Sequence, residues 1–107
     1  MFYRSNDAGF KEILDGVRIK TLVYGDRTLL TEFRLAGGKE LPIHTHVYEQ
    51  TGYLVSGRLK FIVGDETFEA GPGDSWCLRG DVVHAAEVLE DSVMVEIFSP
   101  VREDYLD

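Results

Sequence analysis

The sequence predicts one all-β domain built from antiparallel strands. Its 107 residues are enough for a single hydrophobic core, and we expect residues 1–107 to form one domain. Short apolar runs recur at spacings of about eight to twelve residues, with turn residues between them, as in a sandwich or a barrel. The 11 glycines also favour strands and turns over long helices. Closure into a barrel would remove unpaired strand edges.

One helical turn and four strands are expected in chain order. The turn depends on Phe10, Ile13 and Leu14, whose spacing matches one turn of a helix near the N-terminus. The strands are expected at Val17–Tyr24, Leu29–Leu35, Arg58–Val63 and Ser92–Phe98. Breaks are supplied by Gly25-Asp26, Gly37-Gly38, Gly64-Asp65 and Gly71-Pro72-Gly73-Asp74. Periodicity alone does not choose among a jelly roll, an immunoglobulin-like sandwich and a lipocalin-like barrel.

The charge distribution argues against a nucleic acid or an anionic membrane as partner. The formal net charge is -8, and the 11 Lys and Arg residues form no cluster. The sequence has neither the ~18 consecutive apolar residues of a membrane span nor a signal-peptide pattern, so a cytoplasmic location is expected. An anionic substrate would need local cations, for which Arg58, Arg79 and Arg102 are the candidates. The single Cys77 excludes an internal disulfide and is expected to be buried.

The three histidines give the main functional signal. His44 and His46 form an HxH pair, and His84 lies beyond the Pro-Gly-Asp turn. Side chains two residues apart on a strand share a face, so both imidazoles would point toward one metal site. Gln50 has the same strand parity. Neutral imidazole is a common ligand of Zn, Cu, Fe and Ni. The alternative is three ordinary polar residues, but a second pattern around His84 and the lack of any further histidine favour a metal site.

Two motifs resemble those of the cupin superfamily. From Gly38 to Gly57 the spacing is Gly, five residues, HxH, three residues, an acid, six residues and Gly, except that Gln50 stands at the acid position. The neighbouring Glu49 has the opposite strand parity. Some small cupins have a His-His-Gln-His set, so the resemblance implies one divalent metal ion, Zn, Ni, Mn or Fe. Its implied ligands are His44, His46, Gln50 and His84.

The second motif runs from Gly71-Pro72-Gly73-Asp74 to His84 and is looser. Arg79, Asp81 and Val88 stand where the cupin pattern has Pro, Gly and Asn. Together the motifs imply a single antiparallel β-barrel of the jelly-roll type. Cupins are often dimers, so the resemblance also implies a homodimer.

The C-terminal stretch from Glu96 to Leu106 is similar to small single-domain cupins of pectin degradation. Those proteins convert 4,5-unsaturated monouronates into open-chain keto uronates. Their acid, phenylalanine and arginine map by spacing to Glu96, Phe98 and Arg102, with Glu96 in place of the family's Asp. The resemblance implies that Glu96 and Arg102 are catalytic and that Phe98 and Arg102 bind substrate.

The leading hypothesis is therefore a metal-dependent enzyme that acts on a small sugar acid. A metal with neutral ligands keeps its charge and acts as a Lewis acid, Arg102 would bind the substrate carboxylate, and Glu96 would deliver a proton. Two alternatives stay open: an Fe-dependent cupin dioxygenase and a non-catalytic small-molecule binding module. Glu96 could also face solvent on an edge strand, and Arg102 could form only a surface ion pair.

Overall fold

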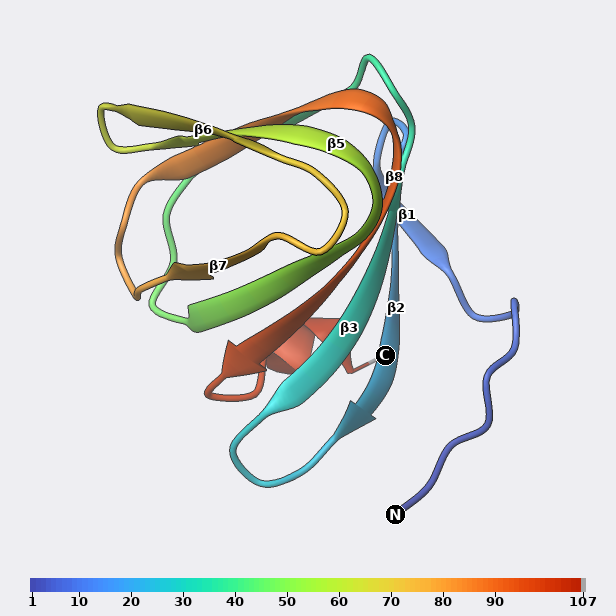
Figure 1. Ribbon diagram of the computed structural model, residues 1–107. Coiled ribbons are helices and arrows are strands. Elements are labelled where there is room, and N and C mark those ends of the chain that lie inside the picture. The colour runs from blue at the N-terminus through green and yellow to red at the C-terminus, as the bar shows by residue number, and fades with distance from the viewer. Residues whose placement is uncertain (107) are drawn as a thin grey trace.

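Eight antiparallel strands curl around one apolar interior in the computed structural model, which describes residues 1–106 (Figure 1). The N-terminal segment lies outside the barrel and reaches it at the first strand (Figure 1). In chain order the strands are β1 (Lys11–Leu14), β2 (Val17–Tyr24), β3 (Leu29–Leu35), β4 (Glu40–His44), β5 (Glu49–Val63), β6 (Glu66–Ala70), β7 (Ser75–Leu78) and β8 (His84–Ser99). A 3-10 turn, η1 (Glu103–Tyr105), follows them.

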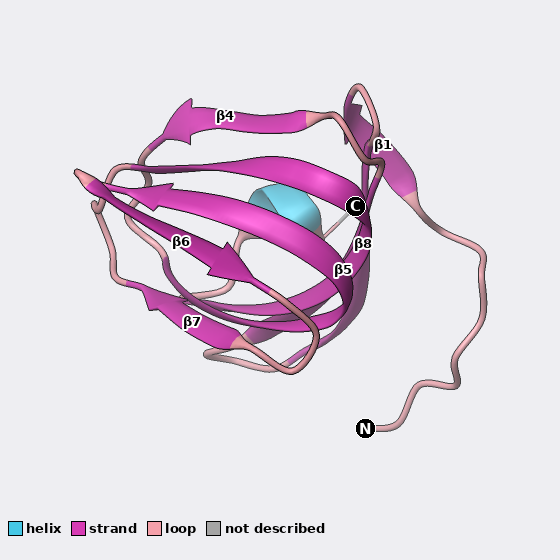
Figure 2. Ribbon diagram, turned by 45° about the horizontal axis from the view of Figure 1, so that its top comes forward, coloured by secondary structure: helices cyan, strands magenta, loops and turns pink. Residues whose placement is uncertain are grey.

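The two longest strands, β5 and β8, connect the two sides of the barrel. The main order of strands is β1-β2-β3-β8-β5-β6, while β4 pairs with β8 and β7 pairs with β5. Strand β8 pairs with β4 near its start and with β3 along its second half, so one continuous strand serves both sides. Both long strands bend around the interior (Figure 2). The register of β5 against β8 shifts on both sides of Ser56, next to Gly57, whose positive φ of 95° suits glycine.

The alternation of side chains along β3 and β8 builds the core. In β3 the buried positions are Leu29, Thr31, Phe33 and Leu35, with less buried residues between them. Strand β8 has the same period, and its second half buries Met94, Glu96 and Phe98. Full burial of one Leu, Met or Phe side chain stabilises the fold by roughly 1.5–3 kcal/mol. The apolar core therefore fixes the orientation of β8 and turns Glu96 into the barrel.

The expected antiparallel β-barrel is confirmed, and two of its strands have the expected bounds. Strands β2 and β3 match Val17–Tyr24 and Leu29–Leu35, while the other two expected strands are the ends of the longer β5 and β8. The first halves of β5 and β8 were missed because polar residues, and in β5 also glycine, interrupt the apolar pattern there.

Two expectations from the sequence were wrong. Residues 11–14 form strand β1 instead of a helical turn, because Lys11 and Glu12 pair with Ile19 and Arg18 of β2. One short helical turn lacks cooperative stabilisation, whereas the sheet supplies partners for the backbone. The one helical element among residues 1–106 is η1, near the other end of the chain. Cys77 is exposed on β7, not buried.

Within residues 1–106 no helix has the length and apolar character needed to cross a membrane.

Candidate metal centre

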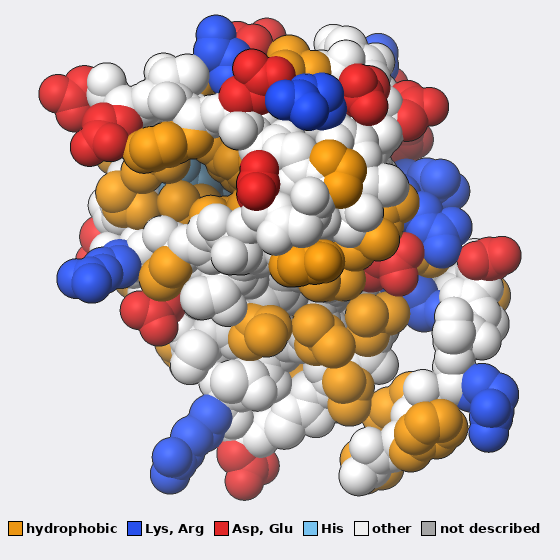
Figure 3. Space-filling view, viewed as in Figure 1, with side chains coloured by type: hydrophobic (Ala, Val, Ile, Leu, Met, Phe, Trp, Pro, Cys, Tyr) orange, Lys and Arg blue, Asp and Glu red, His pale blue; other side chains and the backbone are white. Residues whose placement is uncertain are grey.

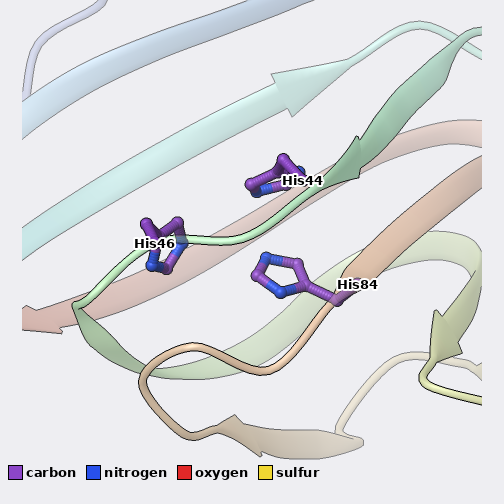
Figure 4. Close-up of side chains that lie close together, drawn as sticks. All are labelled: His44, His46 and His84. Atoms are coloured by element: carbon purple, nitrogen blue, oxygen red, sulfur yellow. The ribbon is translucent and has the colours of Figure 1, made fainter.

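Strand pairing brings the three histidines together. His44 ends β4 and His84 begins β8, and the two residues are register partners in the β4–β8 pair. His46 lies just beyond β4 in the loop to β5, not on the same strand as His44. The three rings point into a common space (Figure 4), and one ligand nitrogen from each lies within 4.8 Å of the others. This spacing allows all three imidazoles to bind one ion.

Backbone carbonyls fix the tautomer of each imidazole. The Nδ1 atoms of His44, His46 and His84 lie 2.7, 3.1 and 2.9 Å from the carbonyl oxygens of Pro42, Tyr48 and Val82. A carbonyl oxygen only accepts, so each Nδ1 carries the hydrogen and donates, which leaves the Nε2 lone pair free. All three rings are therefore oriented as metal ligands through Nε2.

Burial keeps two of these rings neutral. It is the main cause that lowers the pKa of His46 and of His84, and the positive charge of Arg102 lowers the pKa of His46 further. A metal ligand must be unprotonated. The site therefore favours the ligand form of both side chains at neutral pH.

Gln50 contributes a neutral oxygen from β5. Gln50 is buried and Glu49 is exposed, which confirms the parity predicted from the sequence. Its amide Nε2 donates to Glu96 Oε2 at 2.7 Å. Its Oε1 is buried and accepts no hydrogen bond.

The polar atoms of this site are suited to a cation. Among the described residues, the buried side-chain polar atoms without a hydrogen-bond partner are Nε2 of His46, Nε2 of His84 and Oε1 of Gln50. Each is an acceptor, and a buried unsatisfied group costs roughly 1–3 kcal/mol. One divalent ion would satisfy all of them, and imidazole nitrogen with amide oxygen is compatible with Zn, Ni, Mn or Fe. The residues therefore fit the metal that the sequence predicted.

Glu96 lies beside the candidate metal ligands, inside the barrel. It is 3% exposed, so the alternative of a solvent-facing Glu96 is wrong. Its Oε2 accepts from Gln50 Nε2 at 2.7 Å and from Trp76 Nε1 at 2.9 Å. Burial raises the pKa of Glu96 to about 7, while the donors Trp76 and Gln50 and the charge of Arg102 act in the opposite direction. Burial therefore holds the pKa of Glu96 well above the usual range of a glutamate.

Glu96 lines a cavity of about 280 Å³ together with three of the candidate ligands, His44, Gln50 and His84. Figure 3 shows a hollow bordered by hydrophobic side chains, with histidine visible inside it. This volume suits one small molecule. Its polar lining consists of His44, His84, Gln50, Glu96 and Arg102, and its apolar lining includes Phe33, Leu41, Phe61, Leu78, Met94 and Phe98.

Arg102 reaches the cavity from the segment after β8. Its guanidinium lies 3.9 Å from the ring centroid of Tyr105 and 5.1 Å from that of Phe98. It also donates to Asp104 through Nε at 3.3 Å and Nη2 at 2.8 Å. The ion pair considered at the sequence level therefore exists, yet Arg102 still lines the cavity. The other candidate cations are elsewhere: Arg58 pairs with Glu69 and Arg79 is exposed.

Trp76 was not predicted as a site residue. It contacts Glu96 from β7, and Gly52 of β5 is the register partner of both Trp76 and Glu96. A Cβ on Gly52 would overlap the Trp76 indole. A glycine inside a strand marks such close approaches, and that was the available signal in the sequence.

An antiparallel β-barrel with a histidine cluster beside its cavity defines a cupin-type centre. The model of the cupin domain family matches residues 31–99, which include every proposed metal ligand and Glu96. The chain therefore belongs to the cupin domain family.

The chain is similar over its length to individual cupins. It is 24% identical over 107 residues to the pectin degradation protein KdgF of Dickeya dadantii (strain 3937), covering 98% of this chain and 97% of that protein. The structure of KdgF from Halomonas sp. matches with a TM-score of 0.93 at 25% identity, covering 99% of this chain and 98% of that one. An RmlC-like cupin from Shewanella frigidimarina NCIMB 400 matches with a TM-score of 0.92 at 24% identity, covering 98% and 95%.

The buried Glu96 predicts a pH-dependent stability difference in metal-free protein. Since its pKa rises from 4.5 to about 7 on folding, the folded state retains a proton that the unfolded chain has lost between these values. The free energy of unfolding contributed by Glu96 therefore falls as pH rises through this window. Glu96→Gln does not ionise, so its stability relative to wild type should rise with pH, by up to roughly 3 kcal/mol.

Urea unfolding of both proteins at about pH 5 and about pH 8 measures this difference. The lowered pKa values of His46 and His84 affect both proteins alike and cancel. The control is Glu49→Gln, which alters an exposed neighbouring acid and should leave the pH dependence as in wild type. If the difference in unfolding free energy between Glu96→Gln and wild type is the same at both pH values, the raised pKa of the buried Glu96 is contradicted.

Proposed function

We propose that this cupin is a metal-dependent enzyme that converts 4,5-unsaturated monouronates into open-chain keto uronates. The observation that carries this proposal is a buried carboxyl, Glu96, beside a metal-ligand cluster and a guanidinium in one small cavity. Full-length similarity to proteins named KdgF, one of them called a pectin degradation protein, supports a pectin-derived sugar acid as substrate.

We propose His44, His46, Gln50 and His84 as the ligands of one divalent ion. The three imidazoles and the amide are neutral, so a bound ion would retain its charge and act as a Lewis acid toward a substrate oxygen. Zn, Ni, Mn and Fe are all compatible with this ligand set.

Arg102 is proposed to bind the substrate carboxylate. Its Nε and Nη2 are paired with Asp104, while its remaining N–H groups are available at the cavity wall. Charge-assisted hydrogen bonds to a carboxylate contribute roughly 1.5–3 kcal/mol each. The rings of Phe98 and Tyr105 hold the guanidinium plane, so Phe98 both shapes the cavity and orients Arg102.

Glu96 is proposed to deliver the proton that completes the reaction. Ring opening of the unsaturated uronate yields an enol, which becomes a ketone when carbon gains a proton and the enol oxygen loses one. Substrate and product are isomers, so no oxidant or reductant is needed. With its pKa at about 7, Glu96 is protonated in a large fraction of molecules at neutral pH and accepts a proton again afterwards.

The assay for this function follows the absorbance of the unsaturated uronate while metal-loaded protein acts on lyase-generated monouronates. Wild type should remove the band faster than the spontaneous reaction. Loss of the proton carrier in Glu96→Gln should lower the rate roughly 10²- to 10⁴-fold. His46→Ala should also lose activity through the metal centre, whereas Glu49→Gln should retain it because Glu49 is exposed.

Loss of the band at the spontaneous rate with wild type would contradict the proposed activity. Oxygen uptake with Fe(II) would then favour the dioxygenase hypothesis, and binding of a small molecule without turnover would favour a binding module. Full activity in Glu96→Gln would remove Glu96 from the reaction while leaving the substrate assignment in place.

The predicted homodimer and cytoplasmic location are also proposals. A second copy as partner is supported by exposed apolar side chains on the outer surface of the sheet, among them Tyr53, Val55 and Ile97. These side chains come from the adjacent strands β5 and β8. Light scattering should give twice the mass of one chain, and the mass of a single chain would contradict the dimer.

A further inference from the structure

The Gln50 amide must be held in one of two orientations for the metal centre to be complete. Its oxygen and nitrogen ends have nearly the same shape, so packing alone does not choose between them. In the observed orientation, Oε1 has no hydrogen-bond partner and Nε2 donates to Glu96 Oε2 at 2.7 Å. A flipped amide would present an N–H group to the metal ion in place of a ligand oxygen.

The protonated form of Glu96 does not fix this orientation alone, whereas its carboxylate form does, because a carboxylate only accepts. A carboxyl oxygen accepts a hydrogen bond when it is bare but donates when it bears the proton. A proton on Oε2 would make the flipped Gln50 amide equally acceptable, with its oxygen facing Glu96. A group that keeps Oε2 an acceptor is therefore required.

Trp76 meets this requirement because its indole nitrogen is a donor only. Its Nε1 donates to the same Oε2 atom at 2.9 Å. With that N–H in place, a proton on Oε2 is disfavoured, because the O–H oxygen of a carboxylic acid is a weaker acceptor than its carbonyl oxygen. The Gln50 atom 2.7 Å away is then the NH₂ group. We propose that Trp76 is a positioning residue of the metal centre, which acts through Glu96 Oε2 to keep the Gln50 oxygen directed at the three imidazoles.

The strands hold Trp76 in place for this role. Gly52 is the register partner of Trp76 on one side and of Glu96 on the other, and its missing Cβ leaves the space that the indole occupies. The ring of Phe61 packs against the indole with centroids 4.6 Å apart. Trp76 therefore has little freedom to turn its N–H away from Glu96.

The same contacts assign the two oxygens of Glu96. Since Oε2 accepts from both Trp76 and Gln50, the exchangeable proton belongs on Oε1. Trp76 thereby serves both the ligand set and the proton carrier without contacting substrate. This inference rests on the metal centre in the proposed function.

Zinc affinity tests the inference without any turnover assay. Calorimetry with zinc alone compares wild type, Trp76→Phe, Glu96→Gln and the double variant at about pH 8. Each single variant should change the zinc Kd by less than about threefold, because one of the two orienting groups remains. In Glu96→Gln, the Trp76 N–H still donates to the amide oxygen of the side chain at position 96. That oxygen is therefore kept in place to accept from Gln50.

The double variant should bind zinc at least roughly tenfold more weakly than the product of the single effects predicts. Nothing then distinguishes the two orientations of Gln50. If the changes in zinc Kd caused by the two substitutions simply multiply in the double variant, the inference is overturned. Failure of the wild type to bind zinc would instead contradict the proposed metal centre itself.

Gln50→Glu supplies the matched control for a purely structural effect of Trp76→Phe. A carboxylate offers an oxygen in both orientations, so its orientation is immaterial. Adding Trp76→Phe to the Gln50→Glu/Glu96→Gln protein should therefore change the zinc Kd by less than about threefold. A tenfold loss in this background would show that the smaller ring distorts the site, and would overturn the inference.

Discussion

The convergence of unsatisfied acceptors inside the barrel is the constraint on which the rest of the site depends. His46 and His84 each have Nδ1 hydrogen-bonded to a carbonyl, so their Nε2 lone pairs face one another without a donor. Gln50 adds an oxygen in the same state. A folded protein rarely leaves such groups buried without a partner, because each loses its hydrogen bonds to water. A cation bound at this position would satisfy all three at once.

Strand β8 links this metal centre to the proposed chemistry. It begins with His84, carries Glu96 in its buried row and ends beside Phe98, after which Arg102 turns back to the cavity. Glutamate replaces the aspartate expected from the pectin-degradation cupins, but its longer side chain is held by two donors to Oε2. The hydrogen-bonded position of the carboxyl, and not the residue type alone, therefore supports the role proposed for Glu96.

The sequence predicted those features that depend on local pattern. Alternation located β2 and β3, and motif spacing located the histidines and the buried Gln50. The features it missed depend on cross-strand pairing: β1 is a strand because β2 lies beside it, and Trp76 reaches Glu96 only through the register across Gly52.

The most direct test of this account is the position of zinc in a crystal of the protein, located by anomalous X-ray diffraction. The account predicts one zinc ion bound by Nε2 of His44, His46 and His84 and by Oε1 of Gln50, with Gln50 Nε2 still donating to Glu96. Absence of zinc from this cluster, or an ion bound by the histidines with the Gln50 oxygen turned toward Glu96, would contradict it.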